Sequence, residues 1–526
     1  MRKLMEFFRS NAHWLVLAGI VLLGGGLRFS RLDLMEFKSD EREMHRLAVK
    51  QAAGQWQLAG IVSSTGLRNP PMAVYLFAIP ALISRDPIAL AMLPALLNTL
   101  AIALTYFLGR QFLSRGGALA AALLFAVAPW AVIESRKIWA QDLLPFFTIL
   151  FFIFALSWLR KGRWRYALAM AVTLSVLNQI HYSTLALWPI LLFLLWRRHS
   201  KLALKQLAVG AALYAILWAP FAVVVLRGEA FEKGDYRPVR VSVQDIPAHG
   251  ARAMWWQAQL MGYGGFDSLL GVRQPGLTNA MPLSEWLTDA YLALILGGLV
   301  AAVLSLRARP ELWLPLLWFL LPTVLLSVHR VMFHYFIVCW PVTFLLAALF
   351  GESVWQWLQG RVPSIGAWRS AAALLIAFGL AALAVKEVNL TSDFLDFVSW
   401  NGGTLGEYGV CYREKRAVAS YLIDQVPDGR CRLIDRSHPE PDAGDYRYLA
   451  AWLHSRRPAK AGAARFPRPP LFVVQCPGLF VAPWSEAAEE MRDPKRWEDR
   501  GAVPVGTLSV HCFVPVAGSS DGLEKR

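Results

Sequence analysis

Eleven apolar stretches, most of them about as long as a membrane-spanning helix, occupy much of this chain of 526 residues. A helix needs about 20 apolar residues to cross the hydrocarbon core of a bilayer. The stretches lie near residues 12–30, 88–108, 117–134, 142–159, 166–180, 183–196, 204–226, 286–306, 312–328, 335–350 and 370–388. Charged residues make up only 17% of the chain, against about 25% in a soluble domain. These features predict an all-α polytopic membrane protein with about eleven transmembrane helices.

The charges between the apolar stretches predict how the chain is oriented. Every second connection is basic: Arg2, Lys3 and Arg9; Arg110 and Arg115; Arg160, Lys161, Arg163 and Arg165; Arg197, Arg198, Lys201 and Lys205; Arg307 and Arg309; Arg361 and Arg369. Basic loops face the cytoplasm, so the N-terminus is expected inside and the C-terminal region outside. The net charge of +16 lies in these loops rather than on one soluble face, which argues against a nucleic-acid binder.

Two segments need separate interpretation. No A-x-A-like cleavage site follows the first apolar stretch, so we expect a retained helix rather than a signal peptide. The apolar segment from Pro71 to Ser84 has only about 14 residues, too few to cross the bilayer. A crossing here would turn every later basic loop outward. We therefore predict an interfacial or re-entrant helix on the outer side.

The remaining long segments are the outer loops 31–87 and 227–285 and the tail 389–526. The tail has the composition of a soluble domain. It contains two helical patterns, Glu414–Gln425 and Tyr446–His454, and two short strand patterns, Arg432–Ile434 and Leu471–Gln475. We predict a membrane domain over residues 1–388 and a small soluble α/β domain over residues 389–526.

The Arg-, Ala- and Leu-rich composition favours a bacterial source, and thus a multi-pass protein of the inner membrane with a periplasmic tail. Four cysteines lie in that tail: Cys411, Cys431, Cys476 and Cys512. An exported tail could form one or two disulfides among them, in a pairing that the sequence leaves open.

Acidic residues in the first outer loop are candidates for catalysis. Asp40 and Glu41 come directly before a helical pattern, and Glu43 follows three residues after Asp40. Asp40 and Glu43 match the spacing of a capping box, so a structural role at a helix start competes with a catalytic role, and the two can coexist. The acidic run could also hold a divalent cation, but its spacing does not decide this.

Later outer connections supply cations and imidazoles, namely Arg136 and Lys137, His181 and Tyr182, and Arg330 and His334. Cations beside a carboxylate suit a site that holds a phosphate group while a nucleophile attacks nearby. Each could instead be a charge facing solvent or lipid headgroups. His329 and His334 lack the usual spacing of zinc ligands. We find no Walker A loop, G-x-G-x-x-G, G-x-S-x-G or paired C-x-x-C motif, so soluble nucleotide-driven chemistry has little support.

Several of these motifs, in this order, also suggest a family. The Asp40-Glu41 pair precedes Gly54-Gln55-Trp56 and then Asn69-Pro70-Pro71 with Tyr75. Arg136-Lys137-Ile138-Trp139, Leu144-Pro145-Phe146 and Gln179-Ile180-His181-Tyr182-Ser183 follow at later helix ends. This series, over roughly residues 10–350, resembles the GT-C superfamily of integral-membrane glycosyltransferases. It is most similar to the branch that holds the protein O-mannosyltransferases and the lipid A aminoarabinose transferases.

The resemblance implies a GT-C-like membrane core with an outward-facing active site and a polyprenyl-phosphate-linked sugar as donor. It implies that Asp40 acts as general base or positions a metal or the acceptor, and that Glu41 completes the acidic pair. The donor phosphate would be held by Arg136, Lys137, His181, Tyr182, Arg330 and His334. The loop residues Arg68, Asn69 and Tyr75 would lie on the acceptor side.

One departure limits the substrate. The aminoarabinose transferases commonly have a lysine before the Pro-Pro pair, and related members a histidine, whereas this chain has Arg68-Asn69. We therefore do not assign aminoarabinose, and the acceptor could be lipopolysaccharide, a polysaccharide or a protein. Two alternatives stay open. A transporter or flippase would usually show charges at mid-span or repeated halves, which we do not find. A non-catalytic subunit of an envelope assembly machine would tolerate the loss of Asp40.

Overall fold

The computed structural model describes most of the chain in two compact units. The described residues are 2–63, 66–198, 204–231, 242–262, 264–271, 282–328, 332–361, 366–404, 406–426, 432–435, 443–456, 471–475 and 497–515. The first unit comprises Met1–Leu32, Glu43–Gly264 and Asn279–Thr391, and the second Asp33–Arg42, Gly265–Thr278 and Ser392–Arg526. We call them the membrane unit and the tail unit. The predicted division at residue 388 stays a prediction.

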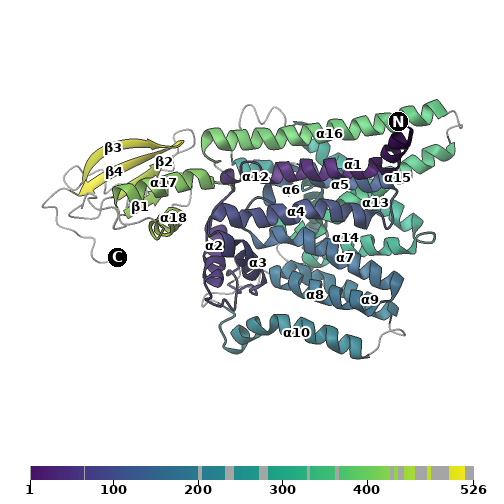
Figure 1. Ribbon diagram of the computed structural model, residues 1–526, viewed down its shortest axis with the longest axis horizontal. Coiled ribbons are helices and arrows are strands. Elements are labelled where there is room, and N and C mark those ends of the chain that lie inside the picture. Colours follow the sequence, from purple (N-terminus) through teal and green to yellow (C-terminus); the bar gives the residue numbers. More distant parts are fainter. Residues whose placement is uncertain are drawn as a thin grey trace. The chain divides into compact units, whose positions relative to one another are not determined.

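Long helices follow the predicted apolar stretches (Figure 1). They are α1 (Arg2–Phe29), α4 (Pro87–Gly109), α5 (Arg115–Val127), α7 (Leu144–Lys161), α8 (Trp164–Ile180), α9 (Trp188–Arg198), α10 (Leu204–Leu226), α13 (Pro282–Ser305), α14 (Trp313–Leu326), α15 (Trp340–Arg361) and α16 (Gly366–Asn401). Among the described residues, seven helices are long and apolar enough to cross a membrane by length and composition. The prediction of an all-α, multi-pass membrane protein is confirmed.

Several helix ends carry local signals that explain where they lie. Asp86 caps α4 by accepting a hydrogen bond from the Ile88 N–H at 3.0 Å. Pro129 ends α5 and opens the short helix α6 (Pro129–Glu134), so the apolar stretch 117–134 is broken in two. Short 3-10 helices lead into three later helices: η2 (Ala140–Leu143) into α7, η3 (Tyr182–Leu187) into α9 and η8 (Phe333–Cys339) into α15.

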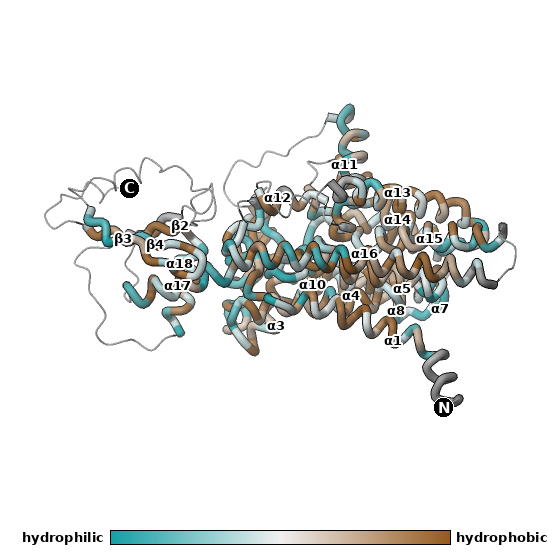
Figure 2. The backbone as a smooth tube through the Cα atoms, turned by 90° about the horizontal axis from the view of Figure 1, so that it is seen from above, coloured by the Kyte–Doolittle hydropathy of each residue, from teal (hydrophilic) through white to brown (hydrophobic). Residues whose placement is uncertain are grey.

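Small residues allow the helices of the membrane unit to approach closely. A Cβ atom on Gly298 of α13 would lie 2.2 Å from the Leu346 carbonyl oxygen of α15, and one on Gly24 of α1 would lie 3.1 Å from the Ala126 Cβ of α5. Helices α1, α4, α5, α7 and α8 form a chain of neighbours in the same unit. Figure 2 shows hydrophobic residues along most of the length of these helices. Apolar packing therefore holds the membrane unit together.

The connections hold additional short helices. The segment after Pro71 forms α3 (Met72–Ile83), whose 12 residues span only about 18 Å. A short helix was predicted here, and it is confirmed; its depth in the membrane stays a prediction. The acidic loop forms α2 (Ser39–Ala52). Helices α11 (Ile246–Gln259) and α12 (Phe266–Leu270) lie in the loop 227–285, where no helix was predicted.

The tail unit contains the predicted α/β domain. Helices α17 (Tyr412–Gln425) and α18 (Gly444–His454) accompany a sheet of strands β1 (Arg432–Asp435), β2 (Leu471–Gln475), β3 (Trp497–Val505) and β4 (Leu508–Pro515). The sheet order is β1-β2-β4-β3, with β1 and β2 parallel and the other pairs antiparallel. The core includes Val418, Leu422, Tyr446, Phe472 and Val510. The predicted elements are confirmed, and the β3–β4 hairpin is an addition.

The predicted disulfides of the tail can be compared with the structure at some of the four cysteines. Cys411 is buried and carries a free thiol, and burial raises the pKa of that thiol to about 12. No disulfide therefore forms through Cys411. Cys431 and Cys476 lie outside the described residues.

Candidate functional site

Residues from three separate helix ends meet in the membrane unit. Lys137 follows α6, His181 follows α8, and His334 lies at the start of η8. The Lys137 Nζ lies 4.3 Å from the ring centroid of Trp139, which lies 5.1 Å from the ring of His334. The His334 ring is 6.2 Å from that of His181, which is 5.7 Å from that of Tyr335. We call these five residues the cation–imidazole cluster.

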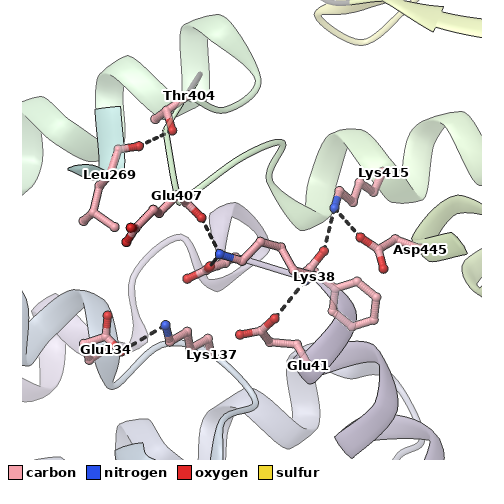
Figure 3. Close-up of polar contacts among 11 residues, drawn as sticks. Lys38, Glu41, Glu134, Lys137, Leu269, Thr404, Glu407, Lys415 and Asp445 are labelled. Carbon is pink, nitrogen blue, oxygen red and sulfur yellow. Dashed lines mark hydrogen bonds and ion pairs between the residues drawn. The ribbon is translucent and has the colours of Figure 1, made fainter. Parts of the chain in front are cut away.

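The charge of the cluster comes from Lys137, whose ammonium is held by a buried carboxylate. The Lys137 Nζ lies 3.0 Å from the Glu134 Oε2, and both side chains are less than one-tenth exposed (Figure 3). The face of the Trp139 ring adds a favourable interaction with the same cation. The lysine is therefore fixed in place, and an incoming anion would share its ammonium with Glu134.

The ring of His181 has a defined tautomer. The Ser183 N–H donates to the His181 Nδ1 at 3.2 Å, and the Ser183 Oγ lies 2.8 Å from the same nitrogen. Burial lowers the pKa of His181 to about 4, so its imidazole is neutral near pH 7. In a neutral ring with an accepting Nδ1, the proton is carried by Nε2. His181 can therefore donate a hydrogen bond to an anion without being charged.

Acid should destabilise the protein partly through His181. Between about pH 6.5 and 4, the unfolded chain binds a proton at this imidazole that the folded chain does not. This contribution to stability is thus fully present above pH 6.5 and is lost as the pH falls. Thermal midpoints in detergent at about pH 5 and 7.5 should differ less in His181→Gln than in the wild type. An identical pH dependence in both proteins would contradict this role.

Arg136, adjacent to Lys137 in sequence, binds backbone carbonyls at the C-terminal end of α1. Its Nη1 donates to the carbonyls of Leu27 (2.8 Å) and Ser30, and its Nη2 donates to that of Arg31 at 2.7 Å. Arg31 has a φ of 50°, in the left-handed region, where a side chain is strained. Arg136 thus satisfies carbonyls at a helix end and stabilises a strained turn.

Arg136→Met should therefore act on stability. It removes the hydrogen bonds of a buried guanidinium to three carbonyls at the end of α1 and should cost roughly 3 kcal/mol. The thermal midpoint in detergent should fall well below that of Arg165→Met, a matched removal of an exposed arginine on α8. Equal midpoints for the two variants would contradict the structural role of Arg136.

Asn69, Tyr75 of α3 and Tyr182 of η3 brace the loop 31–87. The Asn69 Nδ2 donates to the Ile61 carbonyl at 3.1 Å, and the Tyr75 hydroxyl donates to the Gln57 carbonyl at 2.7 Å. The Tyr182 hydroxyl donates to the Arg68 carbonyl at 2.9 Å. The predicted acceptor-side segment is therefore anchored beside His181. Arg330, the remaining predicted phosphate ligand, lies outside the described residues, as does His329.

The acidic pair lies in the tail unit, at the start of α2. The helix begins at Ser39, and the Glu41 Oε2 accepts a hydrogen bond from the Lys38 N–H at 2.9 Å. Glu41 thus makes the carboxylate contact of a capping box. The predicted pairing of Asp40 with Glu43 is wrong, because the helix starts two residues earlier than that pairing requires. The Asp40 side chain is exposed in the first turn, where a helix favours negative charge.

The acidic run does not converge on a metal site. Glu41 is only 2% exposed and binds its own helix start, while the Glu43 carboxylate accepts from the Arg46 Nε at 2.6 Å. Among the residues that the structure describes, no group of three or more His, Cys, Asp or Glu side chains is arranged to hold a metal ion. We therefore assign no step to a metal.

Comparison with known proteins agrees with this architecture. Residues 68–224 match the family model of the dolichyl-phosphate-mannose-protein mannosyltransferases. The structure is similar to ArnT from Cupriavidus metallidurans bound to undecaprenyl phosphate, with a TM-score of 0.52, 12% identity and coverage of 97% of this chain and 99% of ArnT. No match was found among curated protein sequences.

A second similarity is to an archaeal oligosaccharyltransferase. The apo enzyme of Archaeoglobus fulgidus matches with a TM-score of 0.52 and 17% identity, over 84% of this chain and 64% of the archaeal chain. The same organism's AglB in complex with an inhibitory peptide and a dolichol-phosphate has a TM-score of 0.50 and 14% identity, over 85% of this chain and 64% of AglB. The predicted resemblance is therefore confirmed at the level of fold.

Proposed function

From the GT-C fold of this integral-membrane chain, we propose that it is a glycosyltransferase that uses a polyprenyl-phosphate-linked sugar. The observation that carries the proposal is the cation–imidazole cluster, which gathers Lys137, His181 and His334 from distant parts of the sequence. Lys137 and His181 both lie within the matched residues 68–224. The fold neighbours support a lipid-phosphate donor, because one holds undecaprenyl phosphate and another a dolichol-phosphate.

The cluster would bind the phosphate of the donor. Lys137 supplies a positive charge, and the Nε2–H of His181 supplies a neutral donor, so the phosphate receives two charge-assisted hydrogen bonds, one of them from a cation. As the bond between the sugar C1 and the phosphate oxygen breaks, negative charge grows on that oxygen. Donors fixed in advance stabilise this charge more in the transition state than in the ground state. The leaving group is polyprenyl phosphate.

Asp40 would act on the acceptor. For a hydroxyl acceptor, its oxygen attacks C1 from the face opposite the phosphate, the new C1–O bond forms, and the hydroxyl proton passes to the Asp40 carboxylate. The sugar configuration is then inverted. Glu41 would hold the helix start through the Lys38 N–H rather than take part in proton transfer. A phosphate acceptor needs no base, and Asp40 would then contribute electrostatically.

The proposed setting is the inner membrane of a bacterium, with the tail on the periplasmic face. The donor would be a lipid-linked sugar on that face, so no nucleotide sugar is needed there. The acceptor belongs to the cell envelope and is lipopolysaccharide, a polysaccharide or a protein. Arg68-Asn69 replaces the lysine of the aminoarabinose transferases, so we propose no aminoarabinose.

The experiment that tests this proposal separates transfer from transport. Purified protein in nanodiscs is given synthetic undecaprenyl-phosphate sugars and, in turn, lipopolysaccharide, polysaccharide and protein acceptors. Release of undecaprenyl phosphate together with a glycosylated acceptor is expected. Movement of the labelled lipid across proteoliposomes without cleavage would instead support a flippase. Neither activity with any donor and acceptor would favour a non-catalytic subunit.

A further inference from the structure

The segment that carries Asp40 is built into the tail unit by contacts that span the length of the sequence. The Tyr412 N–H donates to the Met35 carbonyl at 2.9 Å, and the Tyr408 hydroxyl donates to the Leu34 carbonyl. The rings of Phe37 and Tyr412 lie 5.5 Å apart. The residues just before Asp40 are therefore held by the start of α17, more than 370 residues later.

A buried ionic group extends this attachment to both sides of Asp40. The Lys415 Nζ lies 2.6 Å from the Asp445 Oδ2 and donates to the Phe37 carbonyl at 2.7 Å (Figure 3). The Asp445 Oδ1 accepts from the Arg42 Nη1 at 2.9 Å. Phe37 precedes Asp40 by three residues and Arg42 follows it by two. Asp445 of α18 thus connects directly with Arg42 at one end of the segment and, through Lys415, with Phe37 at the other.

Burying the charges of Lys415 and Asp445 costs desolvation free energy, which points to a role for this ion pair in fixing geometry. Lys415 and Asp445 are 5% and 6% exposed, so both charges have lost most of their hydration. A buried ion pair adds little net stability compared with apolar packing, but it fixes a definite arrangement of the groups it joins. The first turn of α2 already has its own cap in Glu41. The ionic group therefore adds position and orientation to a helix start that is already capped.

We propose that Lys415 and Asp445 are positioning residues for the transfer reaction, which hold the first turn of α2 so that Asp40 meets the acceptor hydroxyl. The inference rests on the proposed function, with Asp40 as the base. It gives Lys415 and Asp445 a role in catalysis that requires no contact between their own side chains and the substrate. A misplacement of about 1 Å at a reacting group can cost about a hundredfold in rate.

The test uses the full-length protein with Lys415→Met and Asp445→Asn. Lys415→Met keeps the apolar stem and removes the donor to Phe37, and Asp445→Asn keeps the shape and removes the charge. Each should lower kcat about ten- to a hundredfold while the KM for the undecaprenyl-phosphate sugar changes less than about twofold. Lys415→Arg should restore part of kcat. The matched control is Arg500→Met, which removes an exposed cation from β3 of the same unit and should leave kcat unchanged.

Hydrogen–deuterium exchange gives a readout that does not depend on activity. In Lys415→Met, amides of residues 37–42 should exchange faster, while those of α18 keep their wild-type rates. Unchanged exchange and unchanged kcat in both variants would overturn the proposal, as would a loss of protection spread over the whole tail unit in both. If wild-type protein transfers no sugar, the proposed function fails, and with it the catalytic role of Lys415 and Asp445. Faster exchange confined to residues 37–42 would then still show that Lys415 and Asp445 hold this segment in place.

Discussion

Asp40→Asn should lower kcat for transfer to a hydroxyl acceptor by about a hundred- to ten-thousandfold, the usual range for a lost general base. The amide cannot take the acceptor proton, although it keeps the size of the side chain. Asp40 is exposed, so the variant should fold normally. The measurement is steady-state transfer from a synthetic undecaprenyl-phosphate sugar, with thermal midpoints recorded for each protein.

The matched control for this variant is Glu43→Gln. Glu43 lies on the same helix as Asp40, and its partly exposed pair with Arg46 contributes little to stability. Glu36, another carboxylate close to Asp40 in sequence, is unsuitable, because it is only 4% exposed and pairs with Lys38. Full transfer by Asp40→Asn, or equal losses in both variants, would remove Asp40 from the chemistry.

Lys137→Met should weaken binding of undecaprenyl phosphate by about ten- to a hundredfold, the worth of one hydrogen bond between charged groups. It should also destabilise the protein by roughly 3–5 kcal/mol, because the buried Glu134 carboxylate loses the Lys137 ammonium as its ion-pair partner. The two effects have different origins, so one further substitution can separate them.

That substitution is Glu134→Gln in the Lys137→Met background. The double variant no longer buries a negative charge at residue 134, so its thermal midpoint should recover most of the loss. Its affinity for undecaprenyl phosphate should stay low, because the ammonium is still absent. Full recovery of affinity in the double variant would show that Lys137 acts only through stability, and would contradict its role as a phosphate ligand.

The candidate site was partly predictable from sequence. Lys137, His181 and His334 were predicted from residue type and from their places at helix ends, and the structure brings them together. Arg136 has the same local signals as Lys137, but its partners are carbonyls 105 to 109 residues away in sequence, so local pattern could not separate the two. The helix start near Asp40 was misplaced by two residues, which changed the capping carboxylate from Glu43 to Glu41.

The fold shows the same division between local and long-range information. Apolar stretches of spanning length predicted the long helices, because burial in a bilayer requires a continuous apolar surface. The hairpin β3–β4 was missed, because β3 carries Glu498, Asp499 and Arg500 and is exposed along most of its length. The attachment of Asp445 to Arg42 has a sequence separation of 403 residues and no local signature. Only the folded chain shows it.

The most direct test of the account is an experimental structure of the protein with undecaprenyl phosphate, because it locates the lipid phosphate without requiring the acceptor to be known. We expect a phosphate oxygen within about 3 Å of the Lys137 Nζ, and a second within hydrogen-bond distance of the His181 Nε2. Phosphate bound elsewhere, with Lys137 still paired to Glu134 alone, would contradict the proposed donor site and the mechanism built on it.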